Sequence, residues 1–292
     1  MMVQLILSAV LTGILTGGVY ALMASGLTLI YGLLDVINVA QGILVILGAY
    51  LSSVLEERLH LDLFLSLVIT MPLLFVLGIA IERAALRRLR TGNNLSILGM
   101  FALALIIEGG LTYFFTSNYI QLHAWYIDAS MKIGSFHLPD IYVFSFLLSM
   151  IFLAVLSLLV YRTTFGQALR ASMQNPVAAR LIGIDVERIA TLTFGLGVSL
   201  AAAGGVAFGA TNAFNPASSY DLISRLLVII VLGGMGSMFG AFFASLLMLV
   251  IGDVVAVIWS PVWSSTVFFA ILIVLLILRP QGIFGQGEGR KQ

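Results

Sequence analysis

Long apolar stretches without a single charged residue alternate with short polar segments along the whole chain. Within each stretch the apolar residues follow one another without the alternation of a membrane barrel strand. About 20 such residues cross a bilayer as an α-helix, which satisfies its own backbone hydrogen bonds. The pattern predicts an all-α polytopic membrane protein with a single transmembrane domain over residues 1–292. The charge-free stretches are 1–34, 36–55, 63–81, 109–127, 141–161, 189–220, 226–252 and 254–278.

Arginine is concentrated in three of the polar segments, residues 82–94, 162–188 and the tail from 279 onward. Because cytoplasmic loops of membrane proteins carry an excess of arginine and lysine, these segments are predicted to be cytoplasmic. The C-terminus is therefore predicted to be cytoplasmic as well. The remaining polar segments carry few basic residues and are predicted to face outward: 56–62, 116–140 and 211–224.

Glycines interrupt the apolar stretch 226–252 at "LGGMGSMFG", residues 232–240. If residue 215 is outside and residue 279 is inside, an odd number of crossings separates them. The stretch is therefore predicted to enter from outside, turn at the glycines and return, as a hairpin over residues 226–258. About eleven helical residues, roughly 16 Å, would reach the middle of the bilayer before the turn.

The polar stretch "DVINVAQG", residues 35–42, resembles a second break of this kind. A shift of 192 residues aligns 36–50 with 228–242, and six of the fifteen positions are identical. Broken helices at corresponding positions of internal repeats recur in transporters, where the breaks line the pathway. We therefore predict a repeat with halves 1–115 and 141–285.

The predicted map has about eight membrane segments, which are six full transmembrane helices and two glycine-broken hairpins. The first hairpin is expected over residues 33–55. A hairpin there places the N-terminus inside, whereas an ordinary crossing places it outside, and the sequence leaves both open. The full helices are expected near 5–28, 63–82, 95–115, 141–161, 189–211 and 264–279.

Composition narrows the function. Only 9% of the residues are charged, against about a quarter in soluble domains, and the net charge of +1 gives no support for nucleic-acid binding. There are no cysteines, and the three histidines lack metal-ligand spacing, so no metal site is predicted. Neither lysine lies in a phosphate-binding GxxxxGK[ST] motif, and no serine in an apolar stretch has a histidine partner for catalysis. The sequence indicates a conduit rather than an enzyme.

The basic segment 162–188 has helical features. Asn175 followed by Pro176 can cap and start a short helix, and Gly183 can end it. Two short helices along the membrane surface, exposing Leu169, Met173, Leu181 and Ile184, would form a docking element. An ordinary positively charged connector is the alternative.

Several ordered motifs together resemble the branched-chain amino-acid ABC transporter permeases. They are "VINVAQG" with "LGAY", "FGQALRASMQNPVAARLIGI", "AAAGGVAFG", "VLGGMGSMFGAFFASLLM" and "RPQGIFG", and they extend from about residue 10 to residue 285. The chain is most similar to the first of the two paired membrane subunits of the hydrophobic amino-acid uptake family. That family usually has Asn-Phe-Ala-His-Gly where this chain has Asn38-Val39-Ala40-Gln41-Gly42, which leaves the exact substrate open.

The resemblance implies the function and the partners. It implies the permease subunit of an ATP-binding cassette importer, in a bacterial inner membrane, for branched-chain or related amino acids. An extracytoplasmic binding protein would deliver the solute, a second homologous permease would complete the pore, and two ATP-binding subunits would hold ATP and magnesium. This chain would itself bind no cofactor. The resemblance assigns contact with the ATPase to a coupling element that includes Gly166, Ala168, Arg170, Asn175, Ala179, Gly183 and Ile184.

Polar and glycine residues at the two breaks are the candidates for the solute pathway. Uncharged amides can bond a passing solute or the unpaired carbonyls of a broken helix. Glycines permit either a turn or close helix packing. Of the acids in or near apolar stretches (Asp35, Glu108, Asp253), Glu108 is expected deepest, where it either contacts solute or forms a structural hydrogen bond. The candidates are Asn38, Gln41, Gly42, Glu108, Gly233, Gly234, Gly236 and Ser237.

The sequence leaves two other functions open. The same type of importer could carry urea, a short-chain amide or another small solute. A protein of a different class, an ion-coupled secondary transporter or channel, would work without an ATPase and would need an ion site in the membrane, for which Glu108 is the candidate.

Overall fold

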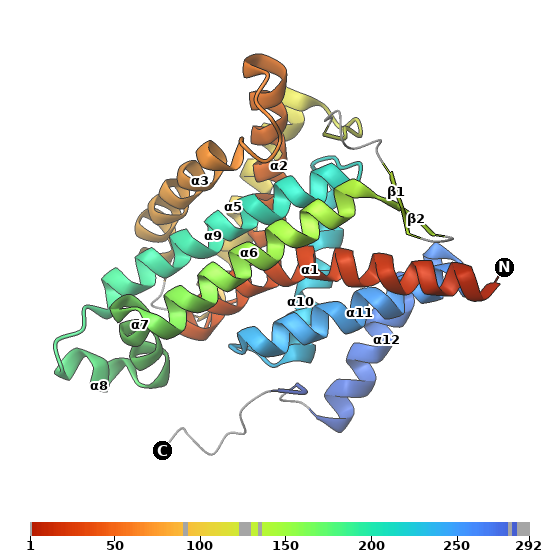
Figure 1. The fold of residues 1–292 in the computed structure, drawn as a ribbon. Helices are drawn as coiled ribbons and strands as arrows, with labels where there is room; N and C mark the ends of the chain where they lie inside the picture. Colours follow the sequence, from red (N-terminus) through yellow and green to blue (C-terminus); the bar gives the residue numbers. More distant parts are fainter. Residues whose placement is uncertain (1, 90–92, 123–129, 134–135, 280–281, 285–292) are drawn as a thin grey trace.

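The computed structural model describes residues 2–89, 93–122, 130–133, 136–279 and 282–284. Expectations that concern Arg90, His123 or the end of the tail lie outside the described residues. Figure 1 shows a bundle of long helices with one small β-hairpin at its edge. The hairpin pairs β1 (Ser130–Ile133) with β2 (Phe136–Pro139) in antiparallel register and was not predicted.

The helices alternate with short connections along the chain. A π-helical segment, η1 (Glu82–Leu86), continues α3 directly. In chain order the α-helices are α1 (Met2–Leu34), α2 (Gln41–Leu59), α3 (Leu67–Ile81), α4 (Arg87–Leu89), α5 (Asn93–Phe115), α6 (Asp140–Arg162), α7 (Thr164–Gln174), α8 (Pro176–Leu181), α9 (Val186–Thr211), α10 (Ser218–Gly233), α11 (Met238–Ile258) and α12 (Pro261–Leu278).

Seven helices of the described residues are long and apolar enough to cross a membrane. Six of them coincide with the six predicted full helices, which confirms the fold class. The seventh is α11, which was expected only as the returning limb of a hairpin. The two remaining membrane segments are α2, which begins directly after the first break, and α10, which ends directly before the second. The seven are α1, α3 with η1, α5, α6, α9, α11 and α12.

Helix α1 runs antiparallel to α11, on which it packs. Gly13, near the start of α1, lies against Val250 near the end of α11. At the other end of α1, Gly32 lies against Gly236, just before α11 begins. Gly32 also contacts Met173 of α7, so α1 ends beside the short helices α7 and α8.

Arginines gather at the end of the bundle that carries α7 and α8, and we call it the arginine end, defined by Arg87, Arg162 and Arg188. The chain after α12 returns to this end as well, because the backbone N–H of Ile283 donates to the carbonyl of Leu232 at 2.8 Å. Helix α1 therefore begins at the opposite end and α12 finishes at the arginine end (Figure 1).

The first break lies at residues 35–40. Asp35 leaves the α1 helix with a φ of 53°, and α2 starts at Gln41. The Gln41 side chain meets Gly197, eleven residues into α9, which corresponds to roughly 16 Å of helix. The break therefore carries the chain from the arginine end to about half the depth of the bundle. Gly42, expected at the turn of a hairpin, lies instead in the first turn of the continuous helix α2.

The second break lies at residues 234–237, where the glycines were expected to turn the chain. Helix α10 begins at Ser218, eight residues before the predicted start at 226, because Asn215 accepts the backbone N–H of Ser218 at 2.9 Å. The longer α10 carries the turn to the arginine end rather than to the middle of the bilayer. The second break therefore lies beside α7 and near the chain that follows α12.

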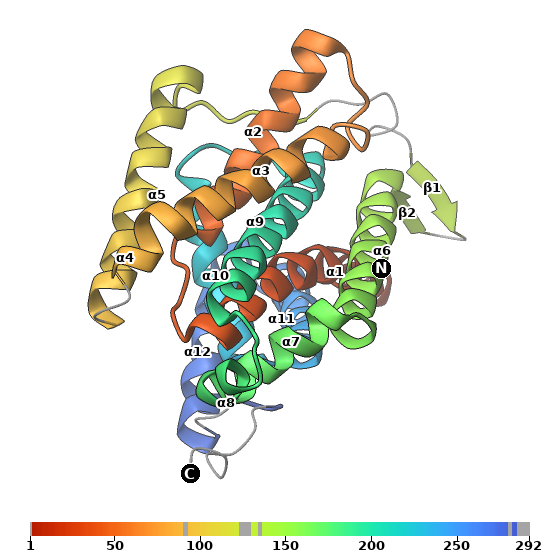
Figure 2. The same ribbon diagram turned by 90° about the vertical axis from the view of Figure 1, so that its left-hand side faces the viewer.

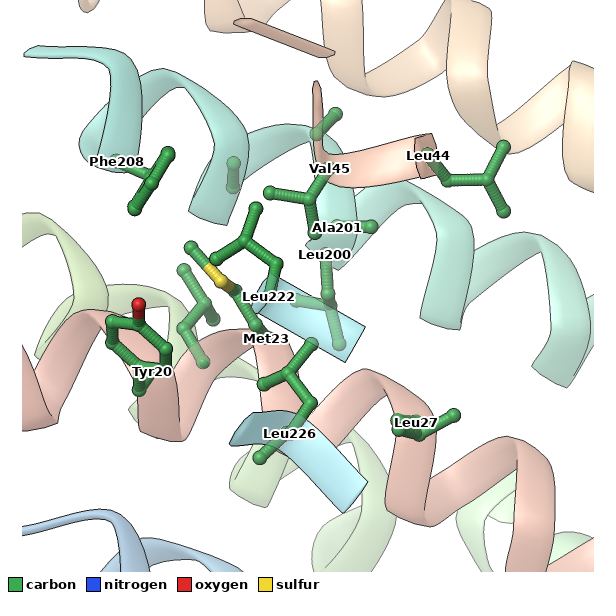
Figure 3. Close-up of a cluster of buried hydrophobic side chains, with 14 of the residues drawn as sticks. Tyr20, Met23, Leu27, Leu44, Val45, Leu200, Ala201, Phe208, Leu222 and Leu226 are labelled. Atoms are coloured by element: carbon green, nitrogen blue, oxygen red, sulfur yellow. The ribbon is translucent and has the colours of Figure 1, made fainter. Parts of the chain in front are cut away.

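Helices α1 and α9 form the centre of the bundle. Glycines let their backbones approach closely: a Cβ on Gly26 would lie 2.7 Å from the carbonyl oxygen of Gly197. Figure 3 shows the apolar side chains that α1, α2, α9 and α10 contribute to this centre. A helix that is apolar on all sides is expected to be buried on all sides. Helix α9 fits that expectation, because 83% of its most apolar stretch is buried inside the bundle.

Helices α1–α3 and α9–α11 are arranged in the same way (Figures 1 and 2). Helix α3 packs along α9 and α11 packs along α1, while α2 follows the break at 35–40 and α10 follows the connection at 212–217. The first turns of α2 and α10 meet, because Gly42 lies against the carbonyl of Ser219. The series α1–α2–α3 and α9–α10–α11 therefore pack in the same order, and they run in opposite directions along the bundle. The 192-residue shift instead pairs the first break with helical residues of α10.

Candidate transport pathway and coupling surface

The amides of the first break are enclosed inside the bundle. Asn38 is 1% exposed and Gln41 is 0% exposed. The Asn38 Nδ2 group donates to Gln41 Oε1 at 3.0 Å, and Gln41 Nε2 donates to the carbonyl of Gly197 at 3.2 Å. These bonds join the start of α2 to the middle of α9. The structural alternative requires bonds of this kind, and contact of either amide with the solute stays a prediction.

We expect Gln41→Leu to lower the free energy of unfolding by about 1–3 kcal/mol, because it leaves a buried amide of Asn38 without its acceptor. Asn38→Leu is expected to act through the same bonds, so the double variant should cost less than the sum of the two. Unfolding of the purified protein in detergent measures the three values. Unchanged stability together with lost transport would instead assign Gln41 to the pathway.

The remaining break residues serve close packing and chain reversal. Gly42 packs on Ser219, and Gly233 packs on Gly240 with no room for a Cβ. Gly234 and Gly236 have φ values of 91° and 87°, which other residues rarely adopt. Ser237 then caps α11, because its hydroxyl accepts the N–H of Gly240 at 3.0 Å.

Glu108 lies apart from both breaks, on the outer helix α5. Its carboxylate accepts a hydrogen bond from the Tyr220 hydroxyl of α10. Tyr220 follows Ser219, which touches Gly42, so this pair lies near the depth at which α2 begins. The pathway candidates therefore separate into three places: the enclosed first break, the turn at the arginine end and the α5–α10 pair.

A group of polar residues on α1, α10 and α11 surrounds Arg225, and of its members only Asp253 was noted from the sequence. Arg225 pairs with Asp221 one helical turn earlier, with Nε and Oδ2 2.9 Å apart, and its guanidinium lies 5.5 Å from the centre of the Phe268 ring. Tyr20 and Asp253 lie close enough to interact with it electrostatically. The i, i+4 spacing of Asp221 and Arg225 could have indicated that α10 includes both.

The basic segment contains the two predicted short helices. Asn175 separates α7 from α8 and caps α8, since its Oδ1 accepts the N–H groups of Val177 and Ala178 at 3.0 Å each. Gly183 follows α8 with a φ of 87°, and Ile184 N donates to the Ala179 carbonyl at 3.0 Å. Asparagine and glycine therefore start and end the helix as their conformational preferences suggest.

Several residues expected in the coupling element hold it to the bundle. Gly166 packs on the Val160 carbonyl, and the Arg170 guanidinium donates to the same carbonyl and lies over Tyr161 at 5.3 Å. Ala168 accepts the Ser172 hydroxyl through its carbonyl at 2.8 Å.

Of the apolar residues expected to be exposed on the coupling element, the structure confirms Leu181 and places Leu169 and Met173 inward. Leu169 is 1% exposed and Met173 contacts Gly32, so both face inward. Both residues belong to α7, which packs its apolar side against the bundle. Apolar residues one helical turn apart on a surface helix normally face the core in this way. Ala179 is also buried. The exposed apolar surface combines the expected Leu181 (84%) with Val177 (65%) and Ile182 (75%), which were not expected.

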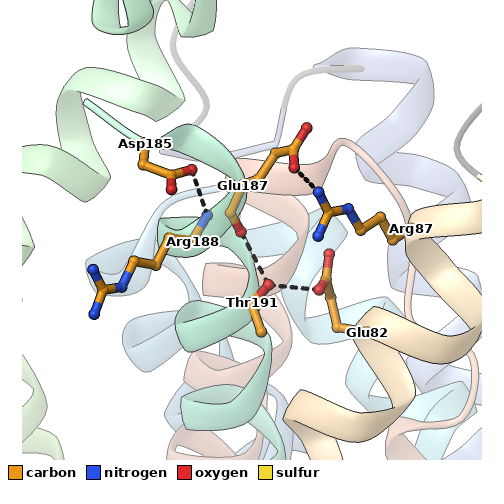
Figure 4. Close-up of polar contacts among 6 residues, drawn as sticks. All are labelled: Glu82, Arg87, Asp185, Glu187, Arg188 and Thr191. Atoms are coloured by element: carbon orange, nitrogen blue, oxygen red, sulfur yellow. Dashed lines mark hydrogen bonds and ion pairs between the residues drawn. The ribbon is translucent and has the colours of Figure 1, made fainter. Parts of the chain in front are cut away.

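A polar cluster joins the end of α3 to the start of α9, next to this element (Figure 4). The Thr191 hydroxyl donates to Oε2 of the buried Glu82 at 2.6 Å, and Arg87 pairs with Glu187. Asp185 caps α9 by accepting the N–H of Arg188 at 3.0 Å. A cavity of about 380 Å³ adjoins these groups.

A larger cavity, of about 640 Å³, lies at the opposite end of the bundle. It is lined by the end of α2 and by the connections before α6 and α10, with Glu56, Glu57, His60, Tyr119 and Gln121 among the lining residues. Metal-binding groups of three or more His, Cys, Asp or Glu side chains are absent from the part of the chain that the structure describes.

Long apolar helices packed around two polar breaks define the class: the chain is a multi-pass α-helical membrane protein. The profile of the family described as "Branched-chain amino acid transport system / permease component" matches residues 9–276. The chain belongs to this family.

Named relatives agree with that assignment. The chain is 30% identical to the high-affinity branched-chain amino acid permease protein BraD of Pseudomonas aeruginosa, over 98% of this chain and 97% of BraD. It is 28% identical to LivH of Escherichia coli K12, again over 98% and 97%. LivM of Escherichia coli K12 is 29% identical over 49% of this chain and 35% of LivM. No solved structure matches the chain.

Proposed function

We propose that the chain is the permease subunit of an ATP-binding cassette importer for branched-chain or related amino acids. The full-length similarity to BraD and LivH, both named as branched-chain amino acid permeases, carries the proposal. The exposed apolar side chains of α8 add support, because a surface of this kind marks an interaction site in a soluble environment.

The proposed importer needs further subunits. A second permease would be homologous to this chain, as the partial similarity to LivM suggests. Two ATP-binding subunits would bind ATP and magnesium and dock on α8, and an extracytoplasmic protein would deliver the solute. Closure of the ATPase pair would then move α7 and α8 with the helices that hold them.

The arginine end is proposed to be cytoplasmic, by the excess of basic residues in cytoplasmic loops. The C-terminus is then on the cytoplasmic side of the bacterial inner membrane, and the start of α1 is on the outer side. Of the pathway candidates, Glu108 is proposed to face the solute path. The glycines and amides of the breaks are proposed to shape the helices around it.

The test is reconstitution of the chain with the second permease, the ATP-binding subunits and the binding protein in liposomes. We expect ATP-dependent uptake of leucine, isoleucine or valine. Uptake of urea or a short-chain amide in place of these amino acids would overturn the proposed substrate. Uptake driven by an ion gradient without ATP-binding subunits would overturn the proposed class.

A further inference from the structure

Polar groups lie on the surface of this chain at a depth where lipid would be expected. The Glu108 face comprises Glu108 and Leu105, which lie one turn apart on the same side of α5, with Tyr220, Asp221 and Ser224 of α10. The Tyr220 residue is 46% exposed and the Asp221 side chain is 58% exposed, and Glu108 is partly exposed.

The depth of this face follows from the helices that carry it. Glu108 precedes the end of α5 at Phe115 by seven residues, about 10 Å of helix. Tyr220 adjoins Ser219, which packs on Gly42 at the point where α2 begins, halfway along α9. Both side chains therefore lie inside the apolar layer formed by the long helices.

Lipid is a poor neighbour for such a face. A charged side chain toward the middle of a bilayer costs at least about 2.5–3.5 kcal/mol, so it normally faces water or protein. The surface beside Glu108 is also open, because a Cβ added at Gly109 or Gly110 would meet no atom within 4 Å. Space next to a carboxylate suits a small solute.

The two carboxylates of the Glu108 face have different partners. Asp221 has a cation, Arg225, at 2.9 Å. Glu108 interacts with the hydroxyl of Tyr220, which is neutral, and this bond leaves further acceptor positions on its two oxygens. An ammonium group supplies three donors and a positive charge, and charge-assisted hydrogen bonds of this type are the strong ones.

We infer that the Glu108 face lines the aqueous solute path and that the Glu108 carboxylate receives the ammonium group of the amino acid. This inference rests on the proposed function. Tyr220 is a positioning residue, since its hydroxyl holds the carboxylate toward the open side. Zwitterionic amino acids are then favoured over amides and urea, which have no cationic nitrogen.

Absence of native cysteine in the chain allows a direct test of water access. Leu105→Cys, one helical turn before Glu108 on the same side of α5, and Ser224→Cys place single thiols on the face. Ile106→Cys, 72% exposed and turned about 160° away from Glu108 around α5, is the matched control at similar depth. The whole importer in liposomes is treated with a charged, membrane-impermeant methanethiosulfonate, with background from partner subunits subtracted. We expect modification at 105 and 224 and none at 106. Equal protection of all three thiols would overturn the inference.

Removal of the charge tests the ligand chemistry. With Glu108→Gln we expect leucine uptake to fall about ten- to a hundredfold, as the loss of a hydrogen bond to a charged group predicts. ATPase stimulation by the loaded binding protein and subunit assembly should persist. Tyr220→Phe, which retains the carboxylate, should show a smaller loss.

The outcomes separate the two proposals. Loss of the second permease from Glu108→Gln complexes would show that Glu108 binds a partner side chain, and unchanged uptake would show that it does not touch the solute; either result overturns the inference. Failure of the wild-type importer to carry any amino acid would overturn the proposed function itself.

Discussion

Replacing Leu181 and Ile182 together by aspartate is expected to separate the chain from its ATP-binding subunits. Both side chains are at least three-quarters exposed at the arginine end, and burial of each would contribute about 1.5–3 kcal/mol. Loss of both corresponds to at least a hundredfold weaker association, roughly, at 1.4 kcal/mol per factor of ten. Copurification of tagged ATP-binding subunits, together with ATP-dependent uptake, provides the measurement.

The matched control is Leu181→Met with Ile182→Met, which keeps both side chains apolar and should retain the complex. Exposed positions contribute little to the fold of the isolated chain, so the aspartate variant should unfold like the wild type. Undiminished copurification of the aspartate variant would show that α8 does not dock on the ATP-binding subunits.

Addition of a single methyl group at Gly205 is expected to destabilise the fold more than any surface substitution. A Cβ there would collide with the carbonyl oxygen of Val45 and lie 3.1 Å from the backbone nitrogen of Ala49. Backbone atoms cannot move aside like the end of a flexible side chain, so α2 must shift away from α9. We expect Gly205→Ala to lower the free energy of unfolding by about 3 kcal/mol, the upper part of the usual range for overpacking.

Gly110→Ala is the control, because nothing lies within 4 Å of an added Cβ there. It should be neutral or slightly stabilising, since alanine favours helices by about 1 kcal/mol over glycine. Thermal unfolding in the same detergent compares the two. A Gly205→Ala midpoint equal to that of Gly110→Ala would show that α2 and α9 do not pack as described.

The sequence predicted the elements whose signals are local. Long charge-free stretches located the full helices, and the Asn175-Pro176 and Gly183 positions located α8, because capping depends on neighbouring residues. Element boundaries next to charges were less predictable. Helix α10 includes Asp221 and Arg225, whose mutual pairing allows charges within a segment that charge counting had ended.

Contacts between distant segments could not be predicted from local patterns. The partner of Gln41 is 156 residues away along the chain, so an amide at a break looked equally suited to a solute. The inward orientation of Leu169 and Met173 similarly depends on α1 and α6, which the loop sequence does not reveal. The Glu108–Tyr220 pair joins α5 to α10 for the same reason.

The bond between Gln41 and Gly197 also has a consequence for biosynthesis. At a synthesis rate of about 5–20 residues per second, the ribosome adds Gly197 roughly 8–30 seconds after Gln41. During that interval the polar start of α2 has entered the membrane before its acceptor in α9 exists. The nascent chain must therefore keep residues 35–41 hydrated or shielded by the insertion machinery until the second half arrives, and variants that slow the synthesis of α9 should prolong that exposure to membrane proteases.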